Sequence, residues 1–214
     1  MLKRMNTSLE VDLQIIHYPE NCKEEWFQSA LDSVKDEPVN LKIYRGNSLG
    51  SLHKRQEFFE FSTAPFVCWI DHDDELVPGT IQKCLDFLQA RGNEKFCGVY
   101  TDYCIMNEES QIVSTMKRPP YEKSTHISNL NRPFHFILFR REAAEKSFLI
   151  PPKFHGAGGG DFYLILAYAT LFGEFAHLGI LGYKWRNRSD SQGKTIKEFP
   201  MLVGHCAQVI TRSL

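Results

Sequence analysis

The residues most suited to chemistry lie together in one stretch, Asp71, His72, Asp73, Asp74 and Glu75. They follow directly on the apolar run 66–70, which is typical of a strand buried on both faces in a parallel sheet. Carboxylates this close repel one another unless a cation compensates them. Their oxygens suit a hard divalent ion such as Mg²⁺ or Mn²⁺, which commonly bridges to a substrate diphosphate. The cluster therefore predicts a metal-assisted site that handles phosphate charge.

A structural explanation of the acidic cluster competes with this one. Acidic side chains favour the N-terminus of a helix, and a helix is expected to begin near Pro78. That would account for Asp74 and Glu75. It accounts poorly for Asp71, which is too far ahead of the helix to contact its end. We therefore favour the functional interpretation.

The elements expected around the cluster alternate between strands and helices. Periodicity predicts strands at 11–17, 39–44 and 66–70, and helices at 23–35, at 48–61 and from Pro78, the last with a buried stripe of Ile81, Cys84, Leu85 and Leu88. This order is typical of a doubly wound α/β sheet, in which ligands bind at the carboxyl ends of the strands. The second half predicts a hairpin (98–106 and 112–116), a strand at 134–139, a helix from Arg140, a loop at 156–160, a helix from Asp161, a strand at 178–186 and a polar tail.

Composition indicates one soluble domain over residues 1–214. Apolar residues make up 43% of the chain, yet no stretch approaches the ~20 apolar residues that a membrane span needs. Lys3 and Arg4 have no apolar region behind them, so a signal peptide is not expected. We expect the cytoplasm of a bacterial or phage-infected cell. The six cysteines contain no CxxC pair and are expected to be reduced core residues.

Residues 11–188 resemble glycosyltransferase family 2, whose members have the GT-A fold, invert the anomeric centre and use nucleotide sugars. Three stretches in the family's order carry the resemblance: 15–18, 50–56, and 66–74, which resembles the family's DxD motif. The resemblance implies that Asp71 contacts the donor nucleotide, that Asp73 is the main metal ligand with Asp71 beside it, and that donor contacts come from His17, Tyr18, Arg45 and Arg55. In 45–47 an acidic pair usual in the family is missing. A UDP-sugar is the expected donor, with Mn²⁺ or Mg²⁺ as the metal.

Two later stretches extend the resemblance. Residues 158–164 resemble the start of the helix that carries the family's catalytic base, so Asp161 is expected to take the acceptor proton, although Asp is also a common helix N-cap. Residues 183–189 resemble the segment that closes over the donor phosphates, which implies donor contacts from Arg186 and Arg188. Arg188 stands where the family usually has a histidine, and arginine binds phosphate but not a metal.

The acceptor is expected on the basic half of the chain. Residues 1–116 hold eleven Lys and Arg against nineteen Asp and Glu, a net charge of −8, whereas residues 117–214 hold fourteen against seven, a net charge of +7. Basic residues interleaved with aromatics suit a polyanion that carries bases. The residues assigned to the acceptor are Arg132, His135, Arg140 and Arg141. The first half, 1–116, is correspondingly assigned to the donor.

The acceptor that we favour is a hydroxymethylated pyrimidine in bacteriophage DNA, flipped out of the stack. An anionic surface polysaccharide or lipid-linked glycan is the alternative within the class. Outside the class, the acidic cluster would also suit a metal-dependent nuclease, and the fold would suit an inactive sugar-nucleotide-binding module.

Overall fold

The computed structural model describes residues 9–46, 51–128, 133, 135–154, 161–189 and 199–212. Its strands are β1 (Val11–His17), β2 (Asn40–Arg45), β3 (Phe66–Asp71), β4 (Glu75–Leu76), β5 (Phe96–Met106), β6 (Ile112–Met116), β7 (Ile137–Arg140) and β8 (Glu174–Arg186). Its helices are α1 (Glu24–Val34), α2 (Ser51–Phe61), α3 (Thr80–Gln89), α4 (Lys123–Ser128), α5 (Arg141–Ala144), α6 (Asp161–Ala169) and α7 (Phe199–Arg212). Short 3₁₀ turns lie at η1 (Pro19–Asn21), η2 (Glu145–Leu149) and η3 (Pro152–Phe154).

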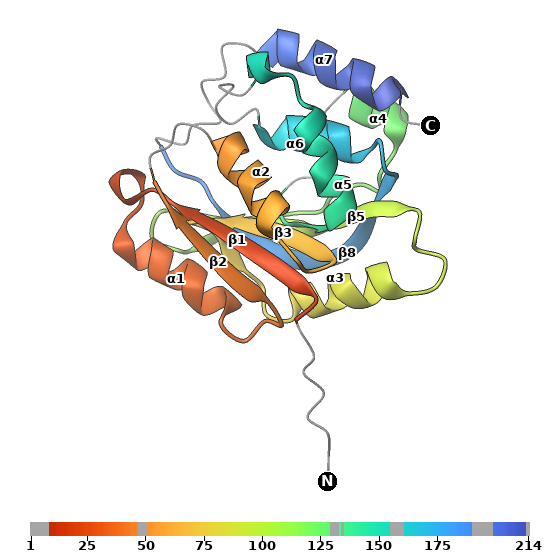
Figure 1. The fold of residues 1–214 in the computed structure, drawn as a ribbon. Helices are drawn as coiled ribbons and strands as arrows, with labels where there is room; N and C mark the ends of the chain where they lie inside the picture. Colours follow the sequence, from red (N-terminus) through yellow and green to blue (C-terminus); the bar gives the residue numbers. More distant parts are fainter. Residues whose placement is uncertain are drawn as a thin grey trace.

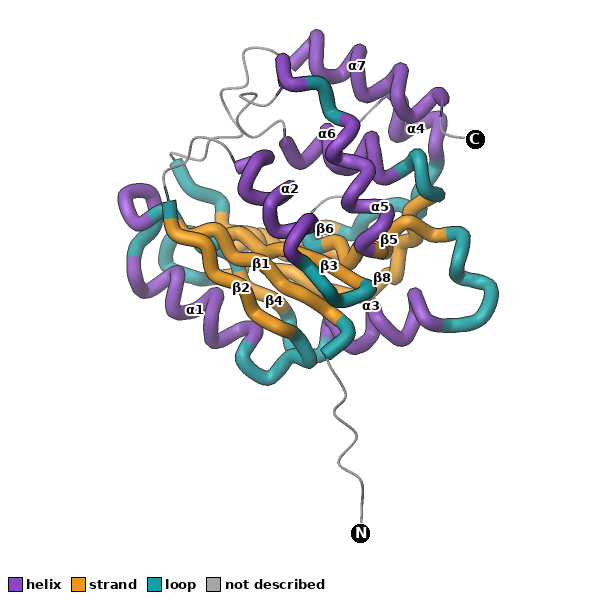
Figure 2. The backbone as a smooth tube through the Cα atoms, viewed as in Figure 1, coloured by secondary structure: helices purple, strands orange, loops and turns teal. Residues whose placement is uncertain are grey.

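The strands form one sheet (Figure 2). Their order in it is β2-β1-β3-β7-β5-β8-β4, with β6 paired to β5. β1 is parallel to β2 and β3, and β5 is parallel to β8. β7 is antiparallel to both of its neighbours, so β5 and β8 run in the same direction as β1–β3. The α/β class with a mostly parallel central sheet is therefore confirmed.

Helices cover both faces of the sheet (Figure 1). On one face lie α1 and α3, and α3 buries the stripe predicted from the sequence, Ile81, Cys84, Leu85 and Leu88, in a cluster with residues of β1, β3, β5 and β7. On the other face, α2, α5 and α6 pack over β3 and β7, and α7 lies over α6. All seven residues of β1 are buried because it is a central strand with a helix layer on each side.

The polar tail expected after residue 186 is wrong in its last part. Residues 199–212 form α7, which buries Leu202, Cys206, Val209 and Ile210 against the α6 side of the core. Their spacing of three to four residues is that of one helical face. β8 also begins earlier than predicted, at Glu174.

All six cysteines are free thiols, and five of them are buried, as the sequence indicated. Among the described residues, no helix is both long enough and apolar enough to cross a membrane.

Candidate active site

Three strand ends form the edge of the sheet at which the sequence predicted a site. In the parallel register His17 of β1 lies beside Arg45 of β2, and Ile16 lies beside Asp71, the last residue of β3. Because the carboxyl ends of parallel strands meet at one edge, His17, Arg45 and Asp71 are brought together from three distant parts of the chain.

Asp74 fixes the acidic loop to β8. Its carboxylate accepts a hydrogen bond from the backbone N–H of Arg186 at 2.7 Å and another from the Tyr183 hydroxyl at 2.8 Å. The Tyr183 oxygen in turn accepts the backbone N–H of Asp71 at 3.2 Å. Burial, more than the neighbouring Asp73 and Asp71, raises the pKa of Asp74 well above its usual value. Asp74 is therefore a structural anchor of the loop.

Side-chain cations compensate the remaining acids of the loop. The Asp71 carboxylate lies 3.2 Å from Nη2 of Arg55, on α2, and that of Asp73 lies 3.0 Å from Nη1 of Arg188, just after β8. Glu75 pairs with the ammonium of Lys184 at 2.7 Å. The repulsion that led us to expect a metal is thus relieved by the chain itself.

Exposure separates the two acids that the sequence assigned to the metal. The Asp71 side chain is 44% exposed, whereas that of Asp73 is only 14% exposed. Burial, with the charge of Asp71, raises the pKa of Asp73 to about 6. Asp71 is therefore the more accessible of the two carboxylates.

The predicted pair of metal ligands does not fit a divalent ion in this arrangement. To reach Asp73, an ion would displace the guanidinium of Arg188, whose side chain is 7% exposed. Removing one partner of a buried ion pair costs about 3–5 kcal/mol. A different group, Asp71, Asp74 and His135, brings one ligand atom from each within 4.8 Å of the others, but Asp74 already accepts two short hydrogen bonds.

A further group beside the site has nitrogen and sulfur donors. His17, Cys22 and His72 bring one ligand atom each within 4.8 Å of one another. Such donors suit zinc rather than Mg²⁺ or Mn²⁺. Burial raises the pKa of Cys22 to about 12, which keeps the thiol protonated, and His72 Nδ1 already accepts the N–H of Tyr18.

Two residues assigned to the donor are buried inside the protein, and their assignments are corrected. The Arg186 side chain is 0% exposed, and it donates to the carbonyls of Asp73 at 2.7 Å and Asn107 at 3.1 Å. It joins the acidic loop to the β5–β6 turn. His17 is 1% exposed, and its ring stacks on Phe27 of α1 at 3.8 Å. The alternation of side chains along β1 turns His17 toward α1 and away from the open edge of the sheet.

Other donor assignments are placed where a ligand could reach them. Arg45 is exposed at the end of β2, and Tyr18 is half-buried at the end of β1. The ammonium of Lys54, on α2, lies 5.0 Å from the centre of the Tyr18 ring. Sequence reasoning did not select Lys54, because the expected helix 48–61 gave no sign of which side chains face the sheet edge.

Of the acceptor residues, His135 is brought to the site. Its ring stacks on Tyr183 at 5.6 Å and lies 6.1 Å from Phe162. Burial lowers the pKa of His135 to about 4, so the ring is neutral near pH 7. Phe162 follows Asp161 in α6, so the start of this helix is close to the acidic loop. The side chain of Asp161 and all of Arg132 lie outside the described residues.

Arg140 and Arg141 are not near the site, which corrects their assignment to the acceptor. Arg140 lies beside Phe66, the first residue of β3, at the opposite end from Asp71. It donates to the carbonyls of Phe96 and Leu88 at 2.9 and 2.8 Å, and Arg141 donates to that of Ala64 at 3.1 Å. The cause is the antiparallel direction of β7, which carries its C-terminal residues away from the acidic loop.

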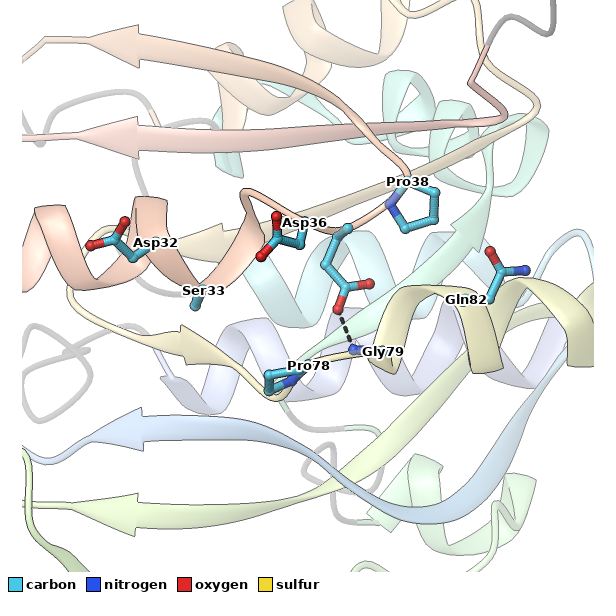
Figure 3. A pocket seen from close by; sticks show the side chains of 8 residues that line it. Asp32, Ser33, Asp36, Pro38, Pro78, Gly79 and Gln82 are labelled. Carbon is cyan, nitrogen blue, oxygen red and sulfur yellow. Dashed lines mark hydrogen bonds between the residues drawn. The ribbon is translucent and has the colours of Figure 1, made fainter.

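A pocket between α1 and α3 is remote from this chemistry (Figure 3). It lies at the C-terminal end of α1, whereas the N-terminal end of α1 follows the carboxyl end of β1. Glu37 lines it and accepts the N–H groups of Gly79 and Ile81. A carboxylate at this place stabilises the N-terminus of α3, so the pocket has a structural explanation.

Comparisons with known proteins agree with this geometry. Residues 22–148, more than half of the chain, match the sequence profile of Glycosyl transferase family 2. No curated protein gave a significant sequence match. Among solved structures, S. aureus TarS 1–349 in complex with UDP-GlcNAc superposes with a TM-score of 0.66 at 13% identity, over 95% of this chain and 67% of that one.

Two further TarS structures give the same fold. The complex of TarS 1–349 with UDP has a TM-score of 0.60 at 12% identity, over 94% of this chain and 64% of that one. S. aureus TarS itself has a TM-score of 0.58 at 14% identity, over 83% of this chain and 37% of that one. The chain thus spans only part of these proteins. From the sequence profile and the shared GT-A architecture we conclude that the chain belongs to glycosyl transferase family 2.

Proposed function

We propose that this glycosyltransferase takes its sugar from a UDP-sugar and binds the donor at the carboxyl ends of β1, β2 and β3. The observation that carries the proposal is the meeting of Tyr18, Arg45 and half-exposed Asp71 at that edge, with Arg188 and Arg55 beside them. A structurally similar protein, TarS 1–349, was solved with UDP-GlcNAc.

Asp161 is the proposed base of an inverting transfer. The acceptor oxygen attacks the anomeric carbon, the bond from that carbon to the diphosphate breaks, and the acceptor proton passes to a carboxylate. Support comes from Phe162, the next residue, whose ring lies 6.1 Å from His135 and 6.4 Å from Trp69. Both contacts put the start of α6 beside the acidic loop.

For the acceptor we retain a hydroxymethylated pyrimidine in DNA, with a surface glycan as the alternative. The net charge of +7 on residues 117–214 supports a polyanion. The half-buried rings of His135 and Trp185, stacked with their centres 5.6 Å apart, support an extruded base. Arg140 and Arg141 bind backbone carbonyls of the fold and take no part in this support.

The test of the donor is a thermal-shift screen of nucleotide sugars, with and without Mn²⁺. A donor that binds the folded state raises its melting temperature by mass action. We expect UDP-sugars to do so and other nucleotide sugars to do so less. If no nucleotide sugar shifts the melting temperature, the proposal fails.

Acceptors are tested next with the donor that binds. The protein and this donor are incubated with a hydroxymethylcytosine duplex, an unmodified duplex or an anionic glycan. The mass of each product is then measured by mass spectrometry. One added sugar per modified base supports the DNA acceptor. If only the glycan gains sugar, the surface glycan replaces DNA as the proposed acceptor. Cleavage of DNA without any sugar nucleotide would instead favour a nuclease. Metal dependence stays a prediction of the sequence, and the same screen tests it.

A further inference from the structure

We propose that the guanidinium of Arg188 takes the place of the divalent cation, neutralising the donor diphosphate so that donor binding needs no metal. This inference rests on the proposed UDP-sugar donor. It concerns how the charge of that donor is met, and it reverses the metal dependence that the sequence predicts.

The first observation is the position of Arg188. Its Nη1 lies 3.0 Å from the Asp73 carboxylate, the group expected to bind the metal, and also donates to the carbonyl of Asn21 at 2.6 Å. Asn21 belongs to the η1 turn that follows β1. A positive charge is therefore fixed between β1, the acidic loop and the end of β8, where a metal held by Asp73 would lie.

The second observation is the charge of the loop as a whole. Three carboxylates, those of Asp71, Asp73 and Glu75, pair with four cationic side chains, Arg55, Lys184, Arg186 and Arg188. The pairing of these acids requires no added ion. A divalent ion would find each carboxylate already engaged by a cation or, at Asp74, by two hydrogen-bond donors.

The third observation is that the cations are not equivalent. Arg186 is fully buried and is committed to backbone carbonyls, and Lys184 is committed to Glu75. Arg55 stacks over Trp69 at 4.4 Å and holds Asp71. Arg188, whose side chain is 7% exposed, is paired with the less exposed acid, Asp73, at the point where the loop meets η1, so it is the cation that stands beside the predicted metal ligand.

Chemically, a guanidinium suits this role. When the anomeric carbon leaves the β-phosphate, the electron pair of the broken bond stays on the phosphate oxygen, and UDP gains negative charge. N–H groups of an arginine bind such oxygens with charge-assisted hydrogen bonds, often two at once. An arginine is permanently charged and needs no metal to supply this stabilisation.

The test measures UDP affinity by calorimetry in Mn²⁺ and in EDTA. For the unaltered protein we expect the two dissociation constants to agree within about threefold, far less than the loss of a required ion would give. Arg188→Ala should weaken UDP about 10- to 100-fold in both conditions, the range for one or two charge-assisted hydrogen bonds.

Arg188→His is the sharper variant, because it puts a metal ligand beside Asp73. We expect it to bind UDP weakly in EDTA and to regain at least about tenfold in affinity with Mn²⁺. Manganese binding by this variant is read independently of UDP from the loss of the free-ion electron paramagnetic resonance signal. Arg91→His, an exposed arginine beyond α3, is the matched control and should behave as the unaltered protein.

The outcomes separate the two proposals. If the unaltered protein binds UDP only with Mn²⁺, or if Arg188→Ala binds UDP normally, the role of Arg188 is overturned while the UDP donor stands. If UDP binds in neither condition, the donor proposal fails and this inference fails with it. Should a variant not fold, the UDP affinity of the unaltered protein in Mn²⁺ and in EDTA still decides whether donor binding needs a metal.

Discussion

Arg186 offers the clearest separation of a structural role from a donor-binding one. The sequence placed it at the donor phosphates, whereas the structure buries its side chain completely. Arg186→Met keeps much of the volume and the apolar stem but removes every N–H of the guanidinium. The backbone N–H that Asp74 accepts is retained.

The expected loss follows from the acceptors left behind. The carbonyls of Asp73 and Asn107 lose a charged donor, and each unsatisfied buried group costs about 1–3 kcal/mol. Ser110 can turn its hydroxyl elsewhere, and Glu75 keeps Lys184. We therefore expect Arg186→Met to lower the free energy of unfolding by about 4 kcal/mol, a large part of the 5–15 kcal/mol typical of a domain.

Urea denaturation followed by circular dichroism measures this change, with the slope of the transition as a check on the two-state analysis. Arg45→Met, at an exposed arginine on the same edge, is the control and should stay within about 0.5 kcal/mol. A loss below about 1 kcal/mol for Arg186→Met, together with a large loss of UDP affinity, would show that Arg186 binds the donor after all.

Three further changes test other parts of the molecule. Asp161→Asn should keep the fold and UDP affinity but lower turnover at least ~10²-fold, the usual contribution of a general base; near-normal turnover would leave it only a helix cap. Arg140→Met should lower the free energy of unfolding by about 2 kcal/mol through its lost carbonyl contacts. DNA binding by Arg140→Met should depend on salt as it does in the unaltered protein, and a flatter dependence would show that Arg140 contacts the acceptor. Burial lowers the pKa of His126 to about 4 from 6.5, so the unfolded chain binds a proton between these values and the folded protein does not. Stability is therefore complete above pH 6.5 and falls by up to about 3 kcal/mol as the pH drops toward 4. In His126→Phe the free energy of unfolding, measured by urea denaturation, should differ less between pH 7 and pH 4.5. An unchanged difference would show that His126 is not the source of the pH dependence.

The sequence by itself was sufficient for the class of fold and for the location of the acidic loop. Local patterns decide these features: the apolar run of β3 and the stripe Ile81, Cys84, Leu85 and Leu88 report burial directly, and the acids that follow β3 must lie at its carboxyl end. Order along the chain then implied that the ends of β1, β2 and β3 meet, because strand–helix–strand units are parallel.

Only the tertiary structure decided what each charged side chain does. The direction of β7 could not be read from residues 137–140, and it is this direction that takes Arg140 and Arg141 away from the site. The burial of Arg186 depends on the β5–β6 turn, which is 76 positions away along the chain at Ser110. The pairing of Asp73 with Arg188 joins residues that no local pattern connects. A carboxylate cluster looks the same in sequence whether a metal or an arginine neutralises it, since the compensating charge comes from wherever the fold brings it.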